Sequence, residues 1–151
     1  MFIPVSRNPN LTASINPNLS ASINPNLTAS INPNLSASIN PNLSASINPN
    51  LSASINPKLT VSINPNIVQN IEGLYIWSLN LKSVGFTVKA NERIRLLFSE
   101  RADFTGILVV VRDNFMNEFD SNNHWTGYWV HARENVWLRY SVDGKWLGCT
   151  S

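Results

Sequence analysis

Apolar and polar residues alternate along residues 8–71, which contain eight copies of one octad, typified by NPNLSASI. The apolar residues take the odd-numbered positions and the polar residues the even ones, until Val68 and Gln69 break the pattern in the last copy. Because eight is an even number, every copy repeats the same parity. A period of two is typical of strands with one buried face, and a proline in every octad excludes a continuous helix. The pattern predicts a short strand, L-[ST]-A-S-I, in each octad.

The Asn-Pro-Asn segment of each octad predicts a corner between these strands. Proline cannot donate to a strand ladder, and it restricts the residue before it to extended geometry. The asparagine after it tolerates the left-handed conformations that occur in bends. Each octad is therefore expected to form one corner and one side of a prism.

The octads need a way to bury their leucine and isoleucine. A single chain with open strand edges buries too little apolar surface to offset the entropy lost on ordering. Three chains wound together would each supply one side of every layer, and the near-identity of the octads suits that symmetry. A single-chain solenoid and a disordered tract are the alternatives. The expected shaft core begins with Leu11, Ala13, Ile15, Leu19 and Ile23.

In period and parity the octads resemble the intertwined triple-stranded β-helix of bacteriophage tail spikes and fibres, particularly the needle of contractile-tail spike proteins. The resemblance covers residues 8–71. It departs in detail, because the needle repeats use Val and Gly where this chain has Ile and Asn-Pro-Asn. The triple β-spiral of viral fibre shafts is a related alternative. The resemblance implies a fibrous homotrimer of viral type.

The ends of the repeat are atypical, as terminal repeats usually are. Residues 1–7 lack the basic and apolar segments of a secretory signal, and Phe2, Ile3 and Val5 are expected to anchor the fibre in a capsid or tail protein. At the other end Lys58 and Val61 break the pattern, which predicts a domain boundary near residue 72. Octad sequons such as Asn10-Leu11-Thr12 are explained better by repetition than by glycosylation.

Charge is confined almost entirely to residues 72–151, since residues 1–71 carry only Arg7 and Lys58. No basic stripe suggests nucleic acid, and no apolar run is long enough to insert in a membrane. The single cysteine, Cys149, excludes an intrachain disulfide. An inert thiol is the favoured interpretation, although termini meeting on a trimer axis would allow an interchain role.

Residues 72–151 hold all five tryptophans and predict an antiparallel β-sandwich or jelly-roll-like head. The expected strands are Leu74–Leu81, Val84–Ala90, Ile94–Ser99, Ile107–Arg112, Trp125–His131 and Val136–Val142. The expected turns are Asp103–Gly106, Asp113-Asn114, Ser121–Asn123 and Asp143-Gly144, the last a strong hairpin signal. The fold class is thus all-β throughout.

Neither catalysis nor metal binding is expected in the head. Glu118 and Asp120 are near enough in sequence to pair as glycosidase carboxylates, yet no spacing rule singles them out. His124 and His131 form neither H-x-H nor H-x-x-x-H, the histidine spacings of metal sites. No nucleophile elbow is present, and no cofactor is expected.

Carbohydrate recognition is the sharper hypothesis, because FDSNNHWTGYWVHAREN joins a polar loop to aromatic residues. Sugar C–H faces pack on aromatic rings while amides and carboxylates bind the hydroxyls. Burial in the core is the competing interpretation for each aromatic. The candidate ligand residues are Asp120, Asn122, Asn123, His124, Trp125, Tyr128, Trp129 and Trp137.

Together these patterns predict a virion appendage: a homotrimeric fibre whose head attaches to a host glycan or other receptor. Two alternatives remain. The head is a trimerisation and folding clamp that keeps identical octads in register, or the molecule is a free multivalent lectin or surface adhesin.

Overall fold

The computed structural model describes residues 11–68 and 73–151, and the second range forms a closed antiparallel barrel. Each strand pairs with its neighbours in sequence, and β1 pairs with β8 to close the barrel. The strands are β1 (Tyr75–Ser78), β2 (Ser83–Lys89), β3 (Ile94–Ser99), β4 (Phe104–Arg112), β5 (Phe115–Asp120), β6 (Trp125–Arg133), β7 (Val136–Ser141) and β8 (Trp146–Thr150). The all-β class is confirmed, but a barrel replaces the predicted sandwich.

The sequence pattern located most strands and missed two, β5 and β8. In β5 the polar Asn117 and Glu118 interrupt the apolar alternation, although both are buried and bonded. The predicted turn at Asp103–Gly106 is also wrong, because β4 already begins at Phe104. Strands with polar partners on both faces leave no clear hydrophobic signature.

The octads do not form strands, so the predicted β-helical shaft is wrong for the residues described. Their regular elements are short 3₁₀ helices: η2 (Ala21–Ile23), η3 (Ala29–Ile31), η4 (Ala37–Ile39), η5 (Ala45–Ile47), η6 (Ala53–Ile55) and η7 (Val61–Ile63). Each octad consists of two turns. At Asn32, the Leu35 and Ser36 amides donate to the Asn32 carbonyl at 3.0 Å. The Ile39 amide then donates to Ser36 at 3.3 Å.

Asparagine and proline account for the first turn of each octad. Proline fixes φ at the second turn position. The asparagine before it accepts the amide two residues on, as when Asn34 donates to Asn32 Oδ1 at 2.9 Å. This side-chain bond imitates a backbone turn. With these bonds made inside the octad, no neighbouring chain is needed to complete a ladder.

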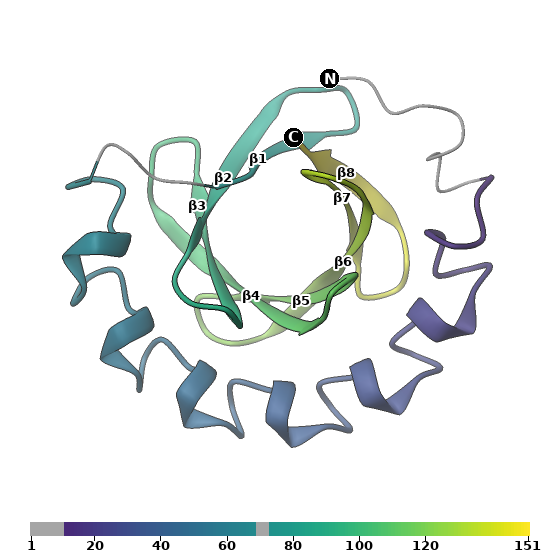
Figure 1. Cartoon of the computed structure of the whole chain (residues 1–151), viewed down its shortest axis with the longest axis horizontal. Coiled ribbons are helices and arrows are strands. Elements are labelled where there is room, and N and C mark those ends of the chain that lie inside the picture. The colour runs from purple at the N-terminus through teal and green to yellow at the C-terminus, as the bar shows by residue number, and fades with distance from the viewer. Residues whose placement is uncertain (1–10, 69–72) are drawn as a thin grey trace.

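Residues 11–68, here named the octad belt, curve around the outside of the barrel (Figure 1). The belt isoleucines are buried in two clusters shared with the outward side chains of the strands. Ile15, Ile23 and Ile31 pack with residues of strands β5, β6, β7 and β8. The four isoleucines Ile39, Ile47, Ile55 and Ile63 pack with residues of strands β2, β3, β4 and β5. Of the expected shaft core, Ile15 and Ile23 are buried while Leu11, Ala13 and Leu19 are exposed.

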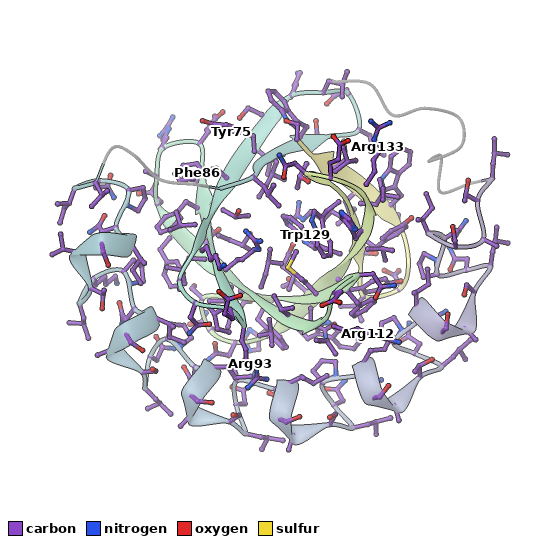
Figure 2. The ribbon with its side chains drawn as sticks, viewed as in Figure 1. Tyr75, Phe86, Arg93, Arg112, Trp129 and Arg133 are labelled. Carbon is purple, nitrogen blue, oxygen red and sulfur yellow. The ribbon has the colours of Figure 1, made fainter. Side chains whose placement is uncertain are left out.

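The barrel is filled by the opposite face of its strands. Ile76, Leu97, Leu108, Met116 and Trp129 form a separate buried cluster that includes no belt residue. Figure 2 places Trp129 at the centre of the barrel. Successive side chains alternate between the two faces of a strand, so one set fills the barrel and the other meets the belt.

The barrel contains a 21-residue repeat of β-hairpins that the sequence analysis did not detect. The tips of the β1–β2, β3–β4, β5–β6 and β7–β8 hairpins each have one residue with positive φ: Leu81, Ala102, Asn123 and Gly144. Four residues later stands a glycine: Gly85, Gly106, Gly127 and Gly148. A Cβ at any of these glycines would lie 2.0–2.1 Å from a carbonyl oxygen of the adjacent strand. The close strand approach therefore requires glycine at that level of the barrel.

The belt and the barrel are held in register by asparagine side chains. The Nδ2 atoms of Asn18, Asn42 and Asn66 donate to tip carbonyls at 3.2, 2.8 and 3.1 Å. The acceptors belong to Gly144, Asn123 and Ala102 in that order. Three octads of the belt therefore span the same stretch of the barrel surface as one 21-residue hairpin. Later octads contact earlier hairpins, so the belt runs around the barrel in the direction opposite to the strand order.

Two predictions fall on residues that the structure does not describe. The anchor residues Phe2, Ile3 and Val5 lie outside the described ranges, as does the boundary near residue 72. Within the described ranges, no helix has the length and apolar character needed to cross a membrane.

Candidate functional site

A cavity of about 520 Å³ lies between the octad belt and the tips of the β5–β6 and β7–β8 hairpins. The barrel contributes Phe119, Asn123, His124, Trp125 and Val142, and the belt contributes Asn26, Asn32, Asn34, Asn40 and Asn42. Ligand cavities typically measure about 300–1,000 Å³. The space suits a small molecule held by amides and aromatic rings.

The β5–β6 turn is fixed by Asp120. Its Oδ1 accepts the backbone amides of Asn122 and His124 at 2.9 Å each, and its Oδ2 lies 3.2 Å from His124 Nδ1. Desolvation acts to raise the pKa of Asp120, but the His124 and Asn122 bonds outweigh it and lower that pKa. The carboxylate is committed to the turn, so it positions the site and is not a free ligand group.

Asn123 joins this turn to the belt. The residue is only 4 % exposed and has a left-handed φ of 65°. Its side-chain amide donates to Asn48 Oδ1 at 3.1 Å, and its carbonyl accepts Asn42 Nδ2 at 2.8 Å. Among the described residues, its Oδ1 has no hydrogen-bond partner. A buried amide oxygen without a donor costs free energy. This wall of the cavity therefore has a hydrogen-bond acceptor that a ligand could use.

Trp125 supplies the aromatic wall of the cavity. The ring is partly buried and packs against both belt clusters, while its Nε1 donates to the Gly127 carbonyl at 2.8 Å. Phe119 lies behind it in the core at 1 % exposure. His124 is open to solvent, with 75 % of its side chain exposed. The ring is therefore held rigidly beside a polar, accessible edge.

The belt asparagines present oriented amides to the cavity. Asn26 and Asn42 donate through Nδ2 to the Val142 and Asn123 carbonyls, and neither Oδ1 has a partner among the described residues. Within the same ranges, Asn32 accepts at Oδ1 and has no partner at Nδ2, whereas the Asn34 side chain has none at either end. Asn40 uses both ends within the belt. The amides of Asn26, Asn32 and Asn42 thus offer acceptors and donors in orientations that existing bonds determine, and Asn34 offers a free amide.

No Lys, Arg, Asp or Glu side chain is among the residues that line this cavity. Amides combine donor and acceptor atoms without net charge. A neutral ligand with several hydroxyl groups and an apolar face fits such a surface better than an ion does.

The other four predicted ligand residues lie in four separate places. Asn122 is exposed on the β5–β6 tip. Tyr128 is fully buried between belt and barrel, stacked on Phe115 and Tyr140, and burial raises the pKa of its hydroxyl. Trp129 is buried inside the barrel, and Trp137 lines a smaller cavity at the other end. These four residues are close in sequence to the cavity residues or were grouped with them, but none of the four lines the cavity.

Glu118 forms a buried ion pair inside the barrel. Its oxygens accept from Arg139 Nε at 2.8 Å, Trp129 Nε1 at 2.9 Å and Thr126 Oγ1 at 2.7 Å. Desolvation raises the pKa of Glu118, but the Arg139 bond and charge, with the Thr126 and Trp129 bonds, lower it overall. Glu118 and Asp120 are each occupied, so the arrangement does not form a pair of glycosidase carboxylates.

The belt asparagines of the cavity were not predicted as ligand residues. These asparagines belong to the Asn-Pro-Asn segment of each octad, and that segment was interpreted as a corner of a shaft. Only the wrapping of the belt brings Asn34 and Asn42 to the β5–β6 tip.

Among the described residues, no group of three or more His, Cys, Asp or Glu side chains is arranged to hold a metal ion. No family model, curated protein or solved structure matches this chain. Inference about function therefore depends on the cavity itself.

Proposed function

We propose that this protein binds a neutral carbohydrate in the cavity between the octad belt and the β5–β6 hairpin. The supporting observation is the combination of a wall of amide side chains with the Trp125 ring, and the absence of Lys, Arg, Asp and Glu among the lining residues. Sugar hydroxyls need both donors and acceptors, and a sugar's C–H face packs on an aromatic ring. The cavity volume suits one or two sugar rings.

Asn34 is the most informative position for testing this proposal. Its side chain lines the cavity and makes no hydrogen bond within the described residues. Replacing Asn34 with alanine is expected to weaken saccharide binding about fivefold or more, because one net hydrogen bond is worth about 1 kcal/mol. A glycan array of the whole chain identifies the saccharide, and calorimetry measures both affinities.

Asn50 provides the matched control, because it occupies the same octad position outside the cavity and its side chain also has no hydrogen bond to the part of the chain that the structure describes. Asn50→Ala should retain full affinity. Absence of saccharide binding on the array, or equal losses from both variants, would contradict the proposal.

The wider fibre hypothesis, with a homotrimer, a capsid or tail partner and a virion location, stays a prediction. The hypothesis was based on an extended shaft predicted from the octads, and the octads form the belt instead. Light scattering of the native protein tests it directly: a homotrimer requires about three times 16.8 kDa. A mass of one chain would leave the free carbohydrate-binding protein as the favoured function.

A further inference from the structure

A second cavity, of about 180 Å³, lies at the barrel end opposite the β5–β6 tip, beside the β2–β3 and β4–β5 loops. It is lined by Lys89, Asn91, Glu92, Arg95, Val110, Asp113, Met116 and Trp137. We propose that this mouth of the barrel binds a small organic monocarboxylate with an apolar or aromatic body.

Strand register places the basic residues on the inner wall of the barrel. Lys89 pairs with Arg95, and Arg95 pairs with Leu108, which belongs to the interior cluster. Residues directly opposite on paired strands share a face. Arg95 and Lys89 therefore face into the barrel, on the same side as Leu108.

Arg95 is half-buried, and its guanidinium makes no hydrogen bond or ion pair with any described residue. The second interior arginine, Arg139, is bonded twice to Glu118. Arg93 and Arg112, at the belt side of the same loops (Figure 2), donate to the Ser38 and Ser22 carbonyls at 2.9 and 2.7 Å. Burial lowers the pKa of Arg95, and only the charge of Glu92 opposes this. A guanidinium in this position lacks the anion that its planar fork can bind through two bonds.

The opposite wall is apolar. Val110 and Met116 pair across β4 and β5, and Trp137 belongs to the neighbouring interior surface. The His131 ring packs against Trp137 with centroids 4.8 Å apart, and His131 Nε2 lies 2.8 Å from the Glu134 carbonyl oxygen. The indole is thereby held in place, so a ligand's apolar body would meet a fixed ring.

The rim carboxylates determine which anion fits. Glu92 is paired with Lys89 at 3.0 Å, and Asp113 also lines the cavity. Two negative groups beside two positive ones disfavour a multiply charged phosphate, because like charges repel strongly at short range. A single carboxylate can bind Arg95 and remain clear of the rim. The volume equals that of about six water molecules, which limits the body to roughly one ring.

Benzoate and benzamide are the matched probes, because they share a ring and differ in charge. Titration followed by NMR should shift the Trp137 indole N–H with benzoate, and benzamide should bind at least about tenfold more weakly. Inorganic phosphate should bind no better than benzamide. This comparison uses the unmodified chain and does not depend on the carbohydrate cavity, so either proposal can fail alone.

Arg95→Met is expected to weaken benzoate binding about tenfold or more while retaining the apolar stem. Arg101→Met removes an exposed arginine whose guanidinium likewise has no partner among the described residues, and it should change nothing. Arg95→Lys serves if the methionine variant does not fold, with a smaller loss expected because lysine lacks the fork. Absence of benzoate binding at tens of millimolar, equal binding of benzamide, or full affinity in Arg95→Met would each overturn the proposal.

Discussion

Replacing Ile55 with alanine is expected to lower the free energy of unfolding by about 2–5 kcal/mol, the usual cost of truncating a buried aliphatic side chain. Ile55 is 0 % exposed and belongs to the cluster that joins the belt to β2 through β5. Its loss would leave a cavity that the barrel cannot fill by moving, because the strands are fixed by their ladders. Urea unfolding followed by tryptophan fluorescence measures the change.

Leu51→Ala, in the preceding octad turn, is the matched control and should change stability by less than about 0.5 kcal/mol. Leu51 is 71 % exposed. The comparison separates two architectures, since an intertwined shaft would bury leucine and isoleucine alike. Equal destabilisation by the two variants would contradict the wrapped belt.

The parity of the octads illustrates why the strand prediction was wrong. Any repeat with an even number of residues preserves the parity of its apolar positions. A pair of four-residue turns therefore produces the same alternation as a strand with a corner. The decisive difference is which apolar residues are buried, and in the belt these are isoleucine and proline but not leucine. That choice depends on contact with the barrel and is not encoded locally.

The 21-residue hairpin repeat was partly visible in the sequence. Gly85, Gly106, Gly127 and Gly148 are evenly spaced, but the positive-φ residues before them are Leu81, Ala102, Asn123 and Gly144. Only asparagine and glycine are typical of that conformation. Two of the four hairpin tips thus carried a recognisable turn signal, and two did not.

The candidate site divides in the same way. Asp120, Asn123, His124 and Trp125 are neighbours in sequence, and the turn at Ser121–Asn123 was predicted although strand β5 before it was not. The facing wall comes from Asn26 to Asn42, some 80–100 residues earlier in the chain. Nothing in the octads themselves distinguishes these asparagines from the copies outside the cavity.

The buried pair of Glu118 and Arg139 gives the second large prediction. Glu118→Gln preserves shape and an acceptor for Trp129 but leaves Arg139 charged and unpaired inside the barrel. Removing one partner of a buried pair costs about 3–5 kcal/mol. Adding Arg139→Met removes the stranded charge, so the double variant should recover most of the lost stability. Urea unfolding of the four proteins gives the coupling between the two sites.

Acid should act on the same pair. The pKa of Glu118 is lowered in the folded protein, so between the folded and unfolded values the unfolded chain binds more protons. The stabilisation is complete above the ordinary glutamate pKa and is lost as pH falls through the lowered folded value. Urea midpoints measured from pH 7 down to pH 3 should therefore fall more steeply for the native protein than for the double variant, which has no carboxylate at this position. Identical pH profiles, or a double variant no more stable than Glu118→Gln, would show that the ion pair does not hold the barrel interior together.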